Sequence, residues 1–100
     1  MNYQNPYRKK VKNSHLLLVS CQVCKADLAI YYKVGRGNLI KLQVHRIHSA
    51  NFPLKPLAKA LNCPECGQQV ASLADYKGKP CYFLFRSLTT SRRISSHDLA

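Results

Sequence analysis

The chain has 100 residues, which is enough for one domain, and it carries 16 Lys and Arg against four Asp and Glu, a formal net charge of +12. Chemistry that depends on paired carboxylates has little to work with at this composition. No apolar run approaches the length of a membrane span, and Leu16–Val19 is far shorter than the apolar core of a signal peptide. The charge favours association with polyanions, and nucleic acid or a ribonucleoprotein is the expected partner.

The distribution of apolar residues divides the chain into three parts. Residues 1–14 read as a flexible basic arm with four cations and no acid, residues 15–86 as the folded domain, and residues 87–100 as a flexible tail rich in Ser and Arg. A core of this size supplies only about 3–5 kcal/mol unaided, so a covalent or metal staple is expected.

Within the domain, the first predicted strand is 15–20, a short apolar run. A hairpin is predicted over 27–47, with a three-residue loop at 35–37 and Gly37 in the left-handed position. This loop length places Leu28, Ile30 and Tyr32 opposite Val44, Leu42 and Ile40 on one apolar face. The opposite face would then be polar and exposed to solvent. A two-residue loop would instead mix polar and apolar side chains on both faces, because a slip of one residue exchanges the faces.

The second half of the domain repeats this order. Prolines and polar residues in 48–56 indicate a crossing loop, and 57–62 is predicted as a strand. A second hairpin is predicted from 68–74 and 80–86, joined by 75–79. The predicted fold is therefore mostly β and zinc-ribbon-like, with two strand–hook–hairpin halves clasped by a four-cysteine metal site.

The hooks of these halves are two C-x-x-C pairs, Cys21-Gln22-Val23-Cys24 and Cys63-Pro64-Glu65-Cys66-Gly67. Four thiolates in two tight turns are what a structural tetrahedral metal site needs, so the predicted ligands of one Zn²⁺ are Cys21, Cys24, Cys63 and Cys66. Iron is an alternative occupant of such a site. A left-handed residue is expected at Gly67, whereas the first hook has neither Gly nor Pro and must turn with ordinary residues.

The remaining cysteine and the acids argue against catalysis. Cys81 lies in an aromatic strand and is expected to be a small core residue. The chain lacks the H-x-E pattern of zinc deaminases, a site closed by four sulfurs has no open position for substrate, and no thioredoxin-like context surrounds either hook. We therefore expect a protein that is not an enzyme, with metal-bound thiols in a reducing, cytoplasmic compartment rather than disulfides.

Three stretches together resemble a family of small bacterial zinc-ribbon proteins. They are Ser20–Cys24, the run Tyr32-Lys33-Val34-Gly35-Arg36-Gly37-Asn38-Leu39 with Arg46-Ile47, and Cys63–Gly67. The resemblance covers roughly residues 16–86. It implies the fold and a zinc site on the four cysteines of the hooks; it implies no activity.

Two functional hypotheses follow from the residues. The first is binding of RNA or single-stranded nucleic acid through the solvent face of the first hairpin and the arm, where cations alternate with an aromatic side chain. Its candidate residues are Arg8, Lys9, Lys10, Lys12, Tyr31, Lys33, Arg36, Lys41 and His45. The alternative is a module that binds a protein partner through Tyr76, Tyr82 and Phe83. Oligomeric state does not follow from the sequence.

Overall fold

The computed structural model describes residues 1–9 and 11–99, so the predicted contact residue Lys10 lies outside the described part of the chain. The described residues form nine strands and two short 3₁₀ turns, in the order β1 (Tyr3–Gln4), β2 (Ser14–Cys21), β3 (Asp27–Val34), β4 (Lys41–Gln43), η1 (Val44–Arg46), β5 (Ile47–Ala50), β6 (Ala60–Asn62), β7 (Gln69–Tyr76), β8 (Lys79–Leu84), β9 (Thr89–Ile94) and η2 (Ser96–Leu99). No helix in this part of the chain has the length and apolarity that crossing a membrane requires.

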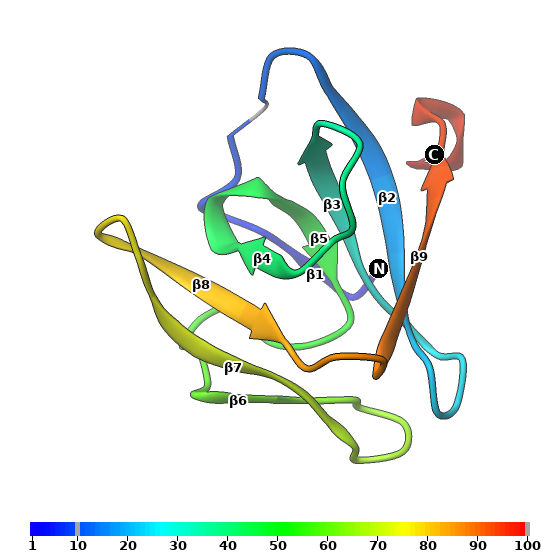
Figure 1. Ribbon diagram of the computed structural model, residues 1–100, viewed down its shortest axis with the longest axis vertical. Helices are drawn as coiled ribbons and strands as arrows, with labels where there is room; N and C mark the ends of the chain where they lie inside the picture. The colour runs from blue at the N-terminus through cyan, green and yellow to red at the C-terminus, as the bar shows by residue number, and fades with distance from the viewer. Residues whose placement is uncertain (10, 100) are drawn as a thin grey trace.

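The strands make two antiparallel sheets (Figure 1). The five-stranded sheet has the order β1-β5-β3-β2-β9 and the four-stranded sheet the order β4-β8-β7-β6. Both sheets contribute to one core, whose largest fully buried apolar side chains are Val19, Leu28, Leu42, Val44, Ile47, Val70 and Tyr82. The chain is mostly β and zinc-ribbon-like, which confirms the predicted fold class.

Several predicted elements are confirmed. The strand expected at 15–20 is β2, and the second hairpin is formed by β7 and β8, whose residues pair from Ala71 with Leu84 to Tyr76 with Lys79. Its turn is tighter than the predicted five residues, since only Lys77 and Gly78 lie between the paired residues. Both have positive φ, 52° and 81°, which matches the twist of a two-residue hairpin turn. The strand expected at 57–62 begins only at Ala60.

The predicted hairpin over 27–47 is wrong. β3 pairs with β2 on one side and β5 on the other, while β4 belongs to the second sheet and pairs with β8. The segment 35–40 therefore carries the chain from one sheet to the other, and we name it the crossing segment. Because β3 is central and four successive residues, Leu28 to Tyr31, are buried, it has no solvent face of the predicted kind. Gly35, with φ +84°, takes the left-handed position assigned to Gly37.

The two ends of the described chain also differ from prediction. In the arm, β1 pairs with β5, and Asn5 is 3% exposed. The Asn5 Nδ2 group donates hydrogen bonds to the carbonyls of Val44 and Ile47 at 2.6 and 2.7 Å. The tail forms β9, which pairs with β2 along six residue pairs from Leu16–Ile94 to Cys21–Thr89. Backbone pairing and one buried side-chain amide thus fix the arm and the tail to the sheets, although neither segment has apolar periodicity.

Candidate metal centre

The first hook is the turn between β2 and β3. The Cys21 N–H donates to the Ala26 carbonyl at 2.8 Å, and the Lys25 N–H donates back to the Cys21 carbonyl at 2.9 Å. Lys25 has φ 68°, so the residue after the second cysteine adopts the left-handed conformation that a side chain disfavours. This is how the hook turns without a glycine.

The second hook repeats this geometry between β6 and β7. The Cys63 N–H donates to the Gln68 carbonyl at 2.8 Å, and the Gly67 N–H donates to the Cys63 carbonyl at 2.9 Å. Gly67, with φ 80°, occupies the position that Lys25 holds in the first hook, as predicted. Each sheet therefore presents one hook of the same shape.

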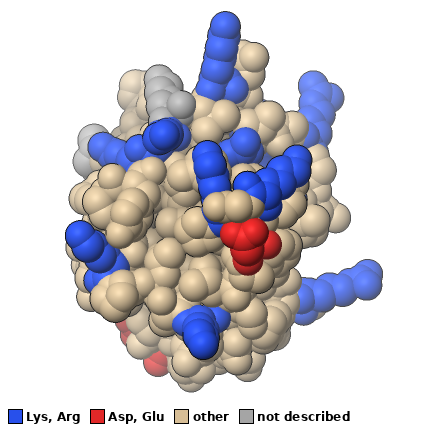
Figure 2. All heavy atoms as spheres, turned by 90° about the vertical axis from the view of Figure 1, so that its left-hand side faces the viewer, with Lys and Arg blue, Asp and Glu red and all other residues tan. Residues whose placement is uncertain are grey.

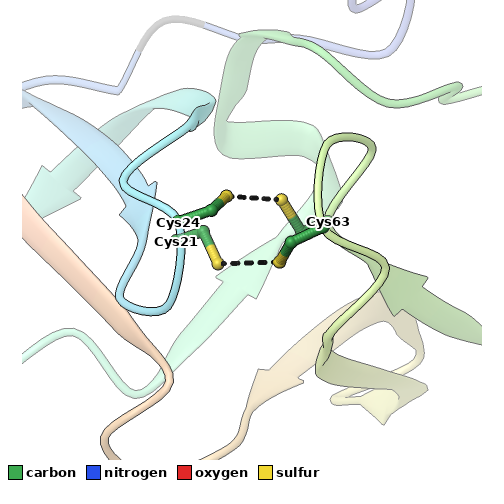
Figure 3. Close-up of side chains that lie close together, drawn as sticks. Cys21, Cys24 and Cys63 are labelled. Carbon is green, nitrogen blue, oxygen red and sulfur yellow. Dashed lines mark hydrogen bonds between the residues drawn. The ribbon is translucent and has the colours of Figure 1, made fainter.

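The hooks face each other across the join between the sheets (Figure 3). The Cys21 and Cys66 sulfurs lie 3.7 Å apart, the Cys24 and Cys63 sulfurs 3.5 Å apart, and all four lie within 4.8 Å of one another. A tetrahedron of sulfurs about 2.3 Å from a central ion has edges of about 3.8 Å. The four cysteines thus fit one four-coordinate metal ion, and the structure brings together every predicted metal ligand.

Backbone amides around the sulfurs favour thiolates. Burial raises the pKa of the Cys21 thiol, but the N–H groups of Cys24 and Val23 act in the opposite direction and bring that pKa down to about 7. Although the Ala26 amide lowers the pKa of Cys24, burial and the neighbouring thiols raise it to about 12. One proton therefore leaves readily, whereas complete deprotonation requires the positive charge of a bound cation.

The two left-handed positions give a stability prediction. We expect Lys25→Gly to raise the free energy of unfolding of the metal-bound protein by about 0.5–1 kcal/mol, because glycine removes the strain of a side chain at positive φ and only part of that gain is offset by chain entropy. Chemical denaturation at fixed metal concentration measures the effect.

Gly67→Ala is the matched comparison. A Cβ at Gly67 would meet nothing within 4 Å, so the expected loss of about 1 kcal/mol reflects backbone conformation rather than a clash. Equal stability of the wild-type and Lys25→Gly proteins would contradict the assigned conformation of the first hook.

The predicted nucleic-acid residues are partly separated. Lys33, Arg36 and Lys41 lie around the crossing segment, where they line two neighbouring cavities. Tyr31 is only 2% exposed and its hydroxyl accepts a hydrogen bond from the Gln43 N–H, so its predicted role as an exposed stacking platform is wrong.

His45 does not share that surface. It lies in η1 and lines a separate cavity with Tyr7 and Leu57, and its Nδ1 is buried with no partner among the described residues. Burial and the nearby Lys79 lower the pKa of His45, so the ring is neutral near pH 7. It is therefore not the cation that the sequence interpretation assigned to the hairpin face.

The arm cations keep exposed side chains on a docked backbone. Arg8, Lys9 and Lys12 are exposed, while the Lys9 N–H donates to the His45 carbonyl at 2.8 Å.

Two further cations that were not predicted from the sequence lie at the crossing segment. Arg46 comes from η1, and Arg93 comes from β9 in the presumed tail. The Thr-rich start of β9, typical of strands, is the one signal that could have placed Arg93 in the fold.

The chain was compared with protein-family models, with curated proteins and with solved structures, and none of them matches it.

Proposed function

We propose that this is a non-catalytic zinc protein that binds RNA or single-stranded nucleic acid through the surface around the crossing segment. The site closed by four sulfurs supports a structural role for the metal, since no position remains for substrate. Zinc is favoured over iron because nothing around the hooks calls for redox chemistry, although iron can occupy the same ligands. Elemental analysis of the native protein, with one zinc per chain expected, tests this part.

Charge alone does not locate an interface. Figure 2 shows Lys and Arg side chains projecting from all parts of one face, with few carboxylates among them. What distinguishes the crossing segment is concavity together with the number of cations, since each of its two cavities is lined by three Lys or Arg residues. Two cavities flank it, and their lining includes five cations and no acid: Lys33, Arg36, Lys41, Arg46 and Arg93. This observation carries the proposal, because hollowed surfaces of one charge concentrate the field that attracts a phosphate backbone.

The salt dependence of binding is the direct test. If the five cations each neutralise a phosphate of a single strand, the slope of log K against log salt is about −3 to −4, and affinity falls on the order of a hundredfold between 50 and 250 mM salt. Fluorescence anisotropy with a labelled single-stranded RNA measures this slope.

A pair of triple variants supplies the control. Lys33→Glu, Arg36→Glu and Lys41→Glu together should abolish binding. The same change of charge at Lys55, Lys59 and Lys77, none of which lines the two cavities, should weaken binding far less. Equal losses in both triple variants, or affinity that is independent of salt, would contradict the proposal.

Docking of a protein partner is the second candidate. Of the side chains first assigned to it, Tyr82 is 1% exposed and its hydroxyl donates to the Ala58 carbonyl, so it is excluded from a surface. Two other apolar side chains favour the idea, because Ile40 and Phe85 are 62% and 38% exposed and line one groove. A pull-down partner that survives nuclease and is lost with Ile40→Ser would favour this candidate over nucleic acid.

A further inference from the structure

One of the two cavities at the crossing segment has the properties of a site for a single anion. It is lined by residues of β3, the crossing segment, β4 and η1, and its volume is about 170 Å³. Pockets for drug-sized ligands measure about 300–1,000 Å³, so this one suits a small group rather than a base with its sugar. Three of its lining residues are cations, and none is an acid.

Arg46 is the first donor available to such an anion. Its Nε atom is buried, and no acceptor for it exists among the residues that the structure describes. A buried donor without a partner is destabilising by about 1–3 kcal/mol, and more when the group is charged. The Arg46 Nε–H therefore lacks an acceptor within the described part of the chain. The side chain is only partly buried and lines the cavity, so a turn of its guanidinium toward the cavity would let an oxyanion there supply one.

Tyr31 is the second donor. Its hydroxyl oxygen accepts the Gln43 N–H at 3.0 Å, so the hydroxyl proton is not used in that bond. Burial raises the pKa of Tyr31, which keeps this proton in place at neutral pH. Tyr31 also lines the cavity, so the buried ring that cannot stack on a base can still donate one hydrogen bond to an anion.

The two lysines of the cavity complete the charge. Lys33 Nζ donates to the Val34 carbonyl at 2.8 Å, which holds the ammonium beside the crossing segment. Lys41 Nζ lies over the Tyr76 ring, 4.8 Å from its centroid. With Arg46, these residues place three cationic side chains in the lining of one small cavity, which favours a dianion over the monoanionic phosphate of a continuous backbone.

We propose that the cavity formed by β3, the crossing segment, β4 and η1 binds a terminal phosphate group, such as that at the end of a nucleic-acid strand. This inference deepens the proposed function and rests on it. The chemistry recognised is a phosphate dianion, which a strand end or free inorganic phosphate can supply. The rest of the strand would then follow the second cavity, past Arg36 and Arg93.

The test compares three RNA oligonucleotides of one sequence, with a 5′-phosphate, a 3′-phosphate or hydroxyls at both ends, by anisotropy at fixed salt. We expect one phosphorylated form to bind about tenfold to a hundredfold more tightly than the hydroxyl form, the range for one or two charge-assisted hydrogen bonds. Arg46→Met should remove this preference. Arg86→Met, which lies at a different groove, should preserve it.

The outcomes separate the inference from the function on which it rests. Equal affinity for all three strands, with salt-sensitive binding retained, overturns the phosphate site and leaves nucleic-acid binding standing. No binding of any strand overturns both.

Titration with inorganic phosphate, followed through the Arg46 Nε–H resonance, gives a second readout. A shift that saturates identifies the cavity as the place where the group binds. A resonance that does not move while the strands are still discriminated places the phosphate elsewhere and overturns the proposed site.

Discussion

Cys63→Ser is expected to abolish metal binding and, with it, the cooperative unfolding transition. Structural zinc contributes an apparent binding free energy of about 10–16 kcal/mol at neutral pH, whereas whole domains are stable by only about 5–15 kcal/mol. Cys63 is 2% exposed and is the buried ligand of the hook carried by the four-stranded sheet. Its loss therefore removes the metal that links the two sheets. Elemental analysis, together with circular dichroism during denaturation, measures both effects.

Cys81→Ala is the matched control for that variant. Cys81 is also fully buried but does not belong to the four-sulfur cluster, so its replacement should keep one metal per chain and a single unfolding transition. Strong chelation of the wild-type protein should reproduce the behaviour of Cys63→Ser. A metal-free Cys63→Ser protein that unfolds cooperatively near the wild-type midpoint would contradict this prediction, because the two sheets would then be stable without the metal site.

Asn5→Ala is expected to lower the free energy of unfolding by about 1–3 kcal/mol, since it removes two buried hydrogen bonds from the Asn5 side chain to main-chain carbonyls. These are the carbonyls of Val44 and Ile47, on either side of the η1–β5 junction. The effect is large for a residue in a segment that looks like an unstructured terminus. Denaturant titration of the metal-bound protein gives the value.

Asn2→Ala provides the comparison, because Asn2 is exposed and makes its hydrogen bond to Asn51 through the backbone N–H. A change within about 0.5 kcal/mol is expected there. If Asn5→Ala were no more damaging than Asn2→Ala, the arm would not be docked as the structure has it.

The metal ligands could be predicted from the sequence because their information is local. A C-x-x-C pair specifies a tight turn with two sulfurs, and the only long-range requirement is that two such turns meet. The β7–β8 hairpin was predictable for the same reason, since Gly78 and its neighbours define a turn between adjacent strands.

The partners of β3 could not be predicted in this way. Alternation of polar and apolar residues selects a register only when a strand has one solvent face, and β3 lies between β2 and β5 in the middle of its sheet. The register that pairs Leu28 with Val44 agrees with the alternation of polar and apolar residues in the sequence. The structure, however, contains no exposed hairpin with that register. As a result, the role given to Tyr31 was also wrong, although Lys33, Arg36 and Lys41 still lie near one another.

The pairing of β9 with β2 has a consequence for the behaviour of the chain in concentrated solution. β2 carries the run Leu16-Leu17-Leu18-Val19, and without β9 it would be the outermost strand of its sheet. An apolar edge with free N–H and C=O groups is a template for pairing between molecules. The cationic residues Arg92 and Arg93 of β9 replace that edge with one that repels its own copies. A variant truncated after Leu88 is therefore expected to aggregate, even with its metal in place.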